Sequence, residues 1–378
     1  EWPLDGEGCV TGDGVWNTST FDCTNYWSPT DLADGSGVDC NSANESDLSC
    51  VYNLTEKVPG DDTRYIMDVW ESWLDTRNAK REARAAAEES KATDSTPFLA
   101  VLWLHSNHQP HPALPEYFFS YNDTFGEPAG DYLGTLTQMD AQIGRLRATL
   151  AARGIANDTL VWYTADNGPH PGSDPSTGLS DVRRATNGLR QCKASVFEGG
   201  IRVPSIIEWP GAISANMVSW LPASTSDILP TMIELMKVTH PQPDWASDGE
   251  SIVPLLMGDN SLVPVSSADP SDGAEVTPRR ARPMGWLYHD SMVWMTVTGQ
   301  YKLVVDPGPG QCDAQNDTVT GVGPYLFDLW DDPTETSPLA TDGEFAPLVE
   351  VMYTELLAFN TSVAMSQVNE SQCLEASA

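Results

Sequence analysis

The clearest pattern in the sequence is an apolar run, a helical stripe and a second apolar run in the first half of the chain. Residues 98–104 and 160–164 are almost continuously apolar, which is typical of strands buried on both faces of a parallel sheet. Between them, apolar residues recur every three or four positions from Tyr132 to Leu150, and this spacing predicts an amphipathic helix that Gly154 ends. A strand, a helix and a strand form a βαβ unit, which implies a parallel sheet.

Weaker patterns flank this unit. Residues 64–90 begin with apolar positions at helical spacing and continue with charged residues, so we expect a helix there. Residues 203–209 have the composition of a strand. Ser226 and Asp227 are expected to cap a helix that runs to Met236.

The pattern changes in the last quarter of the chain. Three short apolar runs separated by turn residues, at 292–298, 301–305 and 325–329, predict a small antiparallel sheet. The predicted fold is therefore α/β, with a mixed or parallel sheet flanked by helices and a smaller C-terminal α+β subdomain. We expect four parts: a loop-rich, disulfide-pinned segment with a polar helix (1–96), an α/β core (97–257), a polar loop (258–284), and an antiparallel-sheet subdomain with a tail (285–378).

The charge of the chain excludes one class of function. Its 378 residues include 20 Lys and Arg against 54 Asp and Glu, for a net charge of -34. Such a chain is repelled by phosphate backbones and anionic membrane surfaces, so we expect no nucleic-acid partner. No run of 18 apolar residues occurs, so we expect no membrane span.

Glycosylation sequons and cysteines indicate an oxidising compartment. Asn-x-Ser/Thr sequons begin at Asn17, Asn44, Asn53, Asn122, Asn157, Asn316, Asn360 and Asn369. Eight sequons favour a secreted, extracellular or lysosome-like glycoprotein, although a chance richness in Asn, Ser and Thr is the alternative. Four of the seven cysteines lie in the first 50 residues without metal-site spacing, which favours disulfides. The first residue is Glu1, so we expect a mature product or a fragment.

Polar residues that could carry chemistry follow the two strands of the predicted βαβ unit. Asp166 and Asn167 come directly after the second strand and offer two oxygen ligands for a hard cation, Ca²⁺ or Mg²⁺. Asp-Asn-Gly is also simply a good turn sequence. His105, His108 and His111 follow the first strand, and the flanking prolines favour a substrate-binding loop over a zinc site.

A third candidate segment combines a cation with paired glycines. Gly199 and Gly200 precede an apolar strand, which implies that two backbone segments approach closely. Lys193 lies just before them and could face an anionic group held by the metal. A solvated side chain is the ordinary alternative for any single lysine.

Seven segments, taken in order, resemble the motifs of the sulfatase family. They are Thr164–Pro169 (the metal turn), Glu198–Pro204 with Glu208–Gly211 (the glycine-rich strand entry), His105-x-x-His108-x-Pro110 (the substrate histidine loop), Met139-Asp140-x-x-Ile143-Gly144 (the central helix), Ser224–Thr231 (the helix before the C-terminal subdomain), and Asp248–Leu256 and Tyr325–Glu335 (late signatures). The resemblance is strong over 97–256, moderate over 285–340 and loose over 1–96.

The resemblance implies an alkaline-phosphatase-like fold and hydrolysis of a small-molecule or carbohydrate sulfate ester with one Ca²⁺ ion. Asp166 and Asn167 correspond to metal ligands. His108 corresponds to the histidine that binds the ester and can protonate the leaving oxygen, and Lys193 to the lysine that holds the sulfate. Four residues are expected to shape the site: Glu198, Gly199, Gly200 and Arg202. Arylsulfatase-like relatives place cysteines at points similar to Cys192 and Cys312, which suggests a disulfide.

The sequence also departs from the family. Sulfatases carry a Cys-x-(Pro/Ala)-Ser-Arg motif whose cysteine is oxidised to formylglycine, and none of the seven cysteines fits it. The family's early Asp-Asp metal pair and its Gly-Lys-x-x-Leu-Gly segment are missing as well. We therefore expect a fragment whose nucleophile is encoded upstream.

Three functions stay open at this point. The first is a sulfatase acting on an aryl or carbohydrate sulfate. The second is a phosphoester or phosphonate hydrolase of the same superfamily, which Asn167 disfavours because two-metal members often have a histidine there. The third is a secreted, non-catalytic pseudo-sulfatase.

Overall fold

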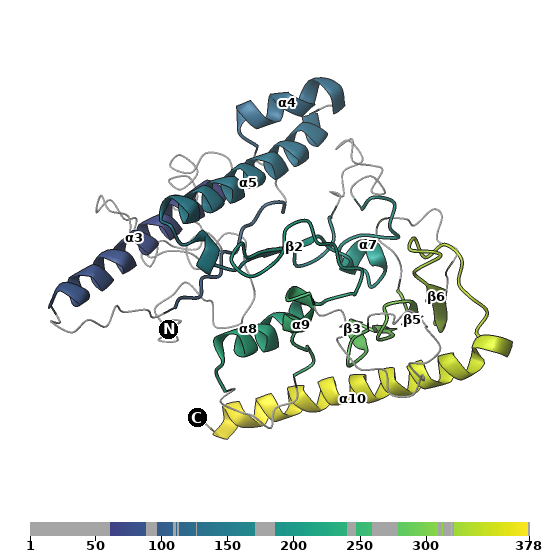
Figure 1. Cartoon of the computed structure of the whole chain (residues 1–378). Helices are drawn as coiled ribbons and strands as arrows, with labels where there is room; N and C mark the ends of the chain where they lie inside the picture. The colour runs from purple at the N-terminus through teal and green to yellow at the C-terminus, as the bar shows by residue number, and fades with distance from the viewer. Residues whose placement is uncertain are drawn as a thin grey trace, which may run out of the picture. The chain divides into compact units, whose positions relative to one another are not determined.

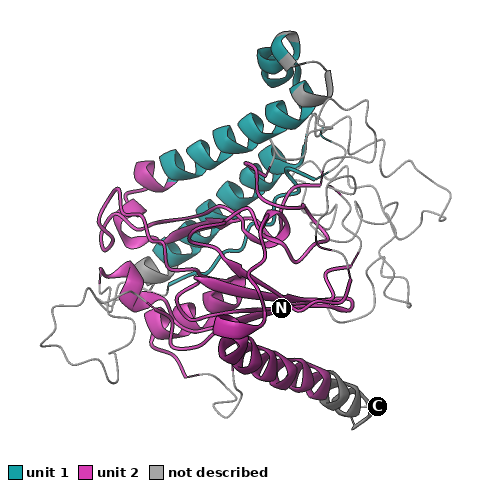
Figure 2. Cartoon of the chain, turned by 90° about the vertical axis from the view of Figure 1, so that its right-hand side faces the viewer, with its two compact units in different colours: residues 1–149 teal, residues 150–378 magenta. Residues whose placement is uncertain are grey.

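The structure is a computed structural model, and it divides the chain into two compact units, Glu1–Thr149 and Leu150–Ala378 (Figure 2). It describes residues 61–87, 97–108, 111, 113–125, 127–170, 186–239, 247–258, 279–308, 312, 319 and 321–376. The predictions for residues 1–60, including four cysteines and three sequons, lie outside these residues, as do those for Asn316 and for most of the loop at 258–284.

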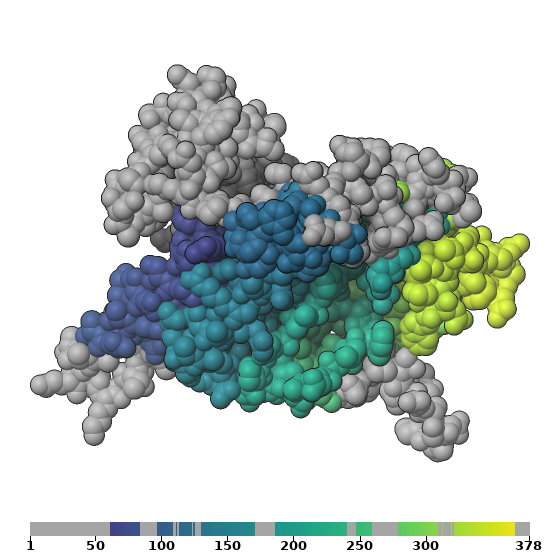
Figure 3. Space-filling view, turned by 90° about the horizontal axis from the view of Figure 1, so that it is seen from above, coloured from purple at the N-terminus to yellow at the C-terminus, as the bar shows by residue number. Residues whose placement is uncertain are grey.

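The described part of the first unit is helical. It contains α3 (Thr63–Ala87), α4 (Pro115–Phe125) and most of α5 (Glu127–Ala152), whose surfaces appear in purple to blue in Figure 3. The helix predicted over 64–90 and the helical stripe from Tyr132 to Leu150 are confirmed as α3 and α5. Gly154 follows α5 with a φ of 68°, a left-handed conformation that suits glycine. Helix α4 was not predicted.

Helices α3 and α5 contact each other through charged side chains as well as apolar ones. Arg145 on α5 lies 2.7 Å from the Asp68 carboxylate and donates from Nε to Glu71 at 3.2 Å. On the buried face of α3, four apolar side chains are almost fully covered: Ile66, Met67, Trp70 and Leu74. The apolar stripe therefore forms the core of this unit, and the charged pairs lie at its margin.

The prediction of a strand at 98–104 is wrong. These residues are extended but belong to no strand, and Leu99, Val101 and Trp103 are 59–65% exposed. An extended segment becomes a strand only when another strand bonds to its backbone, and none does so among the described residues of this unit. The predicted βαβ unit is therefore absent from the described residues.

The second unit begins with a two-stranded ladder (Figure 1). Strand β1 (Val161–Thr164) pairs with β2 (Ser205–Glu208), with Val161 opposite Glu208 and Thr164 opposite Ser205. Both strands were predicted, but they run antiparallel. A parallel pair needs a crossover connection, usually a helix. Among the described residues between these strands, the only helical turn is α7 (Glu198–Ile201).

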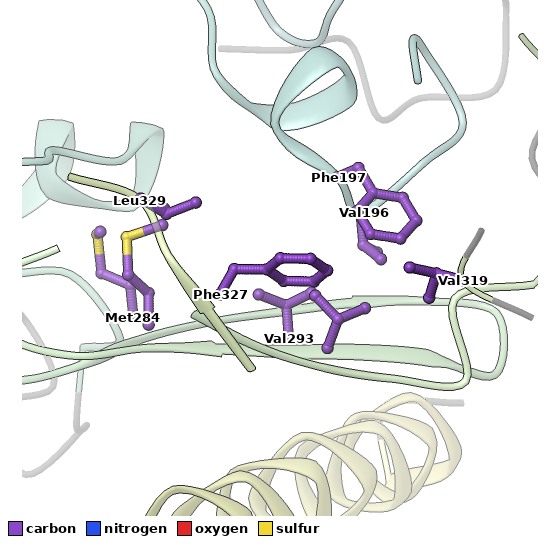
Figure 4. Close-up of a cluster of buried hydrophobic side chains, with 9 residues drawn as sticks. Val196, Phe197, Met284, Val293, Val319, Phe327 and Leu329 are labelled. Carbon is purple, nitrogen blue, oxygen red and sulfur yellow. The ribbon is translucent and has the colours of Figure 1, made fainter. Parts of the chain in front are cut away.

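The predicted C-terminal antiparallel sheet is confirmed. Four strands, β3 (Met284–Tyr288), β4 (Ser291–Met295), β5 (Tyr301–Val305) and β6 (Tyr325–Asp328), lie in the order of the sequence, each antiparallel to the next. Both faces of this sheet are covered. One face carries an apolar cluster that includes Val196 and Phe197 from the loop before α7 (Figure 4).

The other face of the sheet packs on α10 (Ala346–Ala376), a helix that was expected only as a tail. Val349, Met352 and Leu356 of α10 are buried against Leu303 and Leu326. Successive side chains of a strand point to opposite faces. Because Leu303 faces α10, its neighbour Lys302 points to the face covered by the loop before α7.

A polar junction fixes the start of α8 (Ile228–Met236). Ser224, rather than the predicted Ser226, caps the turn of 3₁₀ helix Thr225–Asp227 that leads into α8, and Asp227 completes the capping box. The Asp227 carboxylate also accepts two hydrogen bonds from Arg280, at 2.7 and 2.8 Å, and one from the Glu250 backbone at 2.8 Å. The buried Asp227 carboxylate thus joins its own turn to Arg280 and to Glu250. Helix α9 (Val253–Leu256) begins shortly after Glu250.

Candidate functional site

The turn after β1 presents the two predicted metal ligands. Asp166 is exposed, Asn167 is half-buried and Gly168 is buried. The Asp166 Oδ1 accepts the Asn167 backbone N–H at 2.9 Å, a local bond that shapes the turn. One carboxylate and one amide therefore lie side by side at the surface of the second unit.

The paired glycines hold this turn by close backbone contact, as the sequence predicted. Gly168 donates its N–H to the Gly200 carbonyl at 2.8 Å. A Cβ atom at Gly168 would lie 1.8 Å from the Gly199 carbonyl oxygen, and one at Gly199 would lie 2.1 Å from the Gln191 carbonyl oxygen. Because backbone atoms cannot move aside as side chains do, only glycine fits at these two positions.

The loop of Lys193 is bonded to the same turn. The Lys193 N–H donates to the Pro169 carbonyl at 3.0 Å. Its neighbours Gln191 and Ala194 adopt left-handed φ angles of 59° and 65°. Such angles cost about 1 kcal/mol or more in residues other than glycine and are found most often at functional sites. The structure thus brings Asp166, Asn167 and Lys193 together.

A disulfide fastens this loop to a distant part of the chain. Cys192 and Cys312, the pair that the resemblance suggested, are bonded, with 6.1 Å between their Cα atoms. The Cys312 N–H also donates to the Gln191 side chain at 3.1 Å. In the chain-entropy model, closing a loop of 120 residues stabilises the fold by about 4–5 kcal/mol.

Behind the glycines lies a buried ionic cluster that sequence reasoning missed. Lys302 Nζ lies 2.9 Å from Glu198 Oε1 and 2.8 Å from Glu335 Oε1. All three side chains are at least 95% buried. One signal was available: a lysine in the middle of a predicted strand that is otherwise apolar needs a carboxylate partner if the strand is buried. Arg202, on the rim of this cluster, lies 3.7 Å from Glu198.

Burial and mutual attraction set the charges of this cluster. Burial disfavours the charged form of Lys302, but Glu198 and Glu335 outweigh it and raise the lysine's pKa. Burial, opposed by Lys302 and reinforced by Glu198, raises the pKa of Glu335 to about 7. Lys302 is therefore charged at all ordinary pH values, and Glu335 takes up a proton near neutrality.

The predicted histidine loop belongs to the first unit, unlike the other predicted site residues. The His108 N–H donates to the His105 carbonyl at 2.6 Å, and His108 is exposed. The His105 ring bonds to Asp62 through Nδ1, and the Ser106 hydroxyl donates to Asp61. These two aspartates were not predicted as partners of the loop.

His111 follows the same loop but has a different environment. Its ring packs edge-on against Tyr132, with centroids 5.2 Å apart. Burial, and secondarily the nearby His108, lower the pKa of His111, so its ring is neutral at pH 7. This supports its interpretation as a packed loop residue rather than a proton donor.

Metal ligands, membrane spans and glycan acceptors bear on the wider roles of the chain. Within the described ranges, no three His, Cys, Asp or Glu residues cluster as a metal site. No helix in the part of the chain that the structure describes is long and apolar enough to span a bilayer. Among the sequon residues, Asn157 and Asn360 are exposed and Asn122 is half-buried.

Comparison with known proteins identifies the family. The family model described as Sulfatase matches residues 42–238, which is just over half of the chain. The chain therefore belongs to the sulfatase family.

Two curated relatives show the extent of the match. The chain is 31% identical over 277 residues to the steryl-sulfatase of Rattus norvegicus, covering 70% of this chain and 45% of that protein. It is 31% identical over 283 residues to the arylsulfatase A of Bos taurus, covering 70% of this chain and 50% of that protein. The chain thus spans about half the length of these relatives.

A solved structure supports the fold. The crystal structure of Ps i-CgsB aligns with a TM-score of 0.57 and 18% identity, covering 79% of this chain and 54% of that one. At this identity the likeness concerns the fold alone. It confirms the predicted sulfatase-type α/β fold with a smaller C-terminal sheet.

Proposed function

We propose that this chain forms part of an enzyme that hydrolyses a sulfate ester, R–O–SO₃⁻, with the help of a bound divalent cation. The observation that carries the proposal is the 3.0 Å hydrogen bond from the Lys193 backbone to Pro169. It joins the lysine loop to the turn that carries Asp166 and Asn167. Membership of the sulfatase family supports the same conclusion.

The donor atoms of the turn suit Ca²⁺, and we propose one such ion. Carboxylate and amide oxygens are ligands that Ca²⁺ prefers, and it takes about six to eight of them. Asp166 and Asn167 supply part of this set, so further ligands must come from elsewhere. When bound, the cation stabilises the negative charge on the sulfuryl oxygens.

Two side chains complete the proposed chemistry. We propose that the Lys193 ammonium holds the sulfate group, where its charge would counter the charge that builds up as the ester bond breaks. His108, when protonated, donates its proton to the leaving oxygen. No cysteine here fits the family's formylglycine motif, so the proposal assigns the nucleophile to none of the residues given.

The substrate class and compartment follow from weaker observations. Steryl-sulfatase and arylsulfatase A, by their names, act on sterol and aryl sulfates, and an aryl or carbohydrate sulfate is proposed here. The disulfide and the eight sequons support a secreted or lysosome-like glycoprotein. The net charge of -34 supports the absence of a nucleic-acid partner.

A comparison of two matched esters tests the reaction class. The protein encoded by the longest reading frame of the transcript would be produced in cells that install formylglycine, then given 4-nitrophenyl sulfate or 4-nitrophenyl phosphate. Faster release from the sulfate ester is expected, because Asn167 stands where two-metal phosphoester hydrolases often have a histidine. Preference for the phosphate ester would support the phosphohydrolase alternative. Hydrolysis of neither ester, with a reading frame that starts near Glu1, would support the non-catalytic alternative.

A further inference from the structure

One buried lysine connects the C-terminal sheet to the region of the proposed site. Lys302 lies in β5 between Tyr301 and Leu303, and its side chain is fully buried. Because Leu303 faces α10, Lys302 points to the opposite face of the sheet, which the loop before α7 covers. There it forms ion pairs with Glu198 at 2.9 Å and Glu335 at 2.8 Å.

Glu335 fixes the same segment from a second direction. Its Oε2 accepts the Glu198 backbone N–H at 2.7 Å, and its carbonyl accepts Arg190 Nη1 at 2.6 Å. Glu335 itself has a left-handed φ of 54°, which it adopts although it is not glycine. A residue held in such a conformation by its own contacts is a sign of a defined geometry rather than of loose packing.

Backbone bonds carry this geometry from Glu198 to the proposed metal turn. Gly199, next in sequence, donates to the Arg190 carbonyl at 2.7 Å. Gly200 accepts from Gly168 at 2.8 Å, and Gly168 directly follows Asn167. The path from Lys302 to Asn167 therefore contains two ion pairs and short backbone contacts.

Stability alone does not require charges at this place. Replacing a buried ion cluster with apolar side chains of similar size is often neutral or stabilising, whereas removing one partner leaves an uncompensated buried charge. Charged groups with fixed hydrogen bonds define the position of a segment more narrowly than apolar contacts do.

We propose that Lys302 is a positioning residue of the site. Through Glu198 and Glu335 it holds Gly199 and Gly200 against the turn of Asp166 and Asn167, so the C-terminal sheet sets the geometry of the proposed metal and sulfate site. The inference rests on the proposed function only in taking this turn as the site.

Amide hydrogen exchange on this chain tests the proposal. The amides to follow are Gly168, bonded to Gly200, and Lys193, bonded to Pro169, with the β3–β4 ladder as the reference for global opening. In Lys302→Met, both site amides should exchange at least tenfold faster relative to the reference. Unchanged relative rates in a folded Lys302→Met protein would overturn the proposal.

A neutral variant keeps the test decisive if Lys302→Met does not fold. Lys302→Met combined with Glu198→Gln and Glu335→Gln removes all three charges of this cluster and should fold. Its two site amides should still exchange at least tenfold faster than in the natural protein, because the fixed ion pairs are gone. Full protection of both amides would show that the cluster serves stability alone.

Arg280→Met supplies the matched control. Arg280 is as deeply buried as Lys302, but its side chain bonds to Asp227, Glu250 and the Pro222 carbonyl. This variant should speed exchange at the site and the reference amides equally. Since exchange needs no turnover, a failure to hydrolyse sulfate esters would refute the proposed function and leave this inference standing.

Discussion

At Gly168 the backbone leaves no space for a side chain. We expect Gly168→Ala to lower the free energy of unfolding by about 3 kcal/mol, the upper range for overpacking, because the Cβ would lie 1.8 Å from a backbone oxygen. Denaturant unfolding would measure it. Gly144→Ala is the matched control: no atom lies within 4 Å of its Cβ, and alanine in the helix should add about 0.5–1 kcal/mol. Equal changes in stability for the two variants would contradict the close approach of the Gly168 and Gly199 backbones.

Lys193 allows a direct test of its proposed role. In the active protein, Lys193→Ala should lower kcat/KM about 10²–10³-fold, the scale for losing one electrostatic stabiliser. Lys80→Ala, an exposed lysine on α3, should leave the rate unchanged. Unchanged turnover of a sulfate ester by the Lys193 variant would remove this residue from the site.

Single residues near the turn were predictable where a local rule applied. The paired glycines indicated close backbone approach, and Asp166 with Asn167 indicated a turn rich in oxygen ligands. Lys302 and Glu335 were not found, because their partners lie 104 and 137 residues away and no local rule links them. The aspartates that bond to the histidine loop were missed for the same reason, since 43 or 45 residues separate the partners.

At the scale of elements, one carboxylate organises the start of α8. Asp227→Ala should lower the free energy of unfolding by about 3–5 kcal/mol, because it leaves Arg280 buried without its partner. Burial opposes the charge of Asp227, but the bonds from Arg280 and two backbone amides prevail and lower its pKa below 3.8. The stabilisation is therefore present above pH 3.8 and is lost as the pH falls through the lowered pKa.

Chemical denaturation at several pH values would measure both effects. Asp342→Ala, at an exposed residue that makes no capping bond with its side chain, should change stability by less than about 0.5 kcal/mol. If Asp227→Ala lowered the free energy of unfolding as little as Asp342→Ala does, the proposed role of Asp227 at the start of α8 would be wrong.

Helices α3, α5 and α8 and the C-terminal sheet were predictable from the sequence, whereas α4, α10 and the pairing of β1 with β2 were not. The helical spacing in α5 and the short apolar runs at β4, β5 and β6 carry their own signal. The segment 98–104 shows why an apolar run is insufficient, since a strand also needs a backbone partner that its own sequence does not reveal. The antiparallel pairing of β1 with β2 likewise depends on the path of the chain between them.

At the scale of the whole molecule, the ionic cluster connects stability to pH. The pKa of Glu335 is raised from 4.5 to about 7, so the folded state keeps a proton that the unfolded state has lost. The stabilisation from this proton is therefore complete below pH 4.5 and is lost as the pH rises through 7. The loss in the free energy of unfolding is on the order of 3 kcal/mol. Glu335→Gln lacks this titration, so its stability relative to the natural protein should increase between pH 4.5 and 8.

Unfolding curves of both proteins across this range would measure the difference. Glu344→Gln, at an exposed glutamate, should show a constant difference from the natural protein. A constant difference for Glu335→Gln as well would show that folding does not raise the pKa of Glu335.

We propose that the Asp166 turn and the Lys193 loop form one cation-dependent site for a sulfate ester. The most direct measurement is release of 4-nitrophenol from 4-nitrophenyl sulfate by the protein from the longest reading frame, during a Ca²⁺ titration, for the natural sequence and for Asp166→Ala. Activity should rise with Ca²⁺ in the natural protein and be abolished in the variant. Equal, Ca²⁺-independent hydrolysis by both proteins would contradict it.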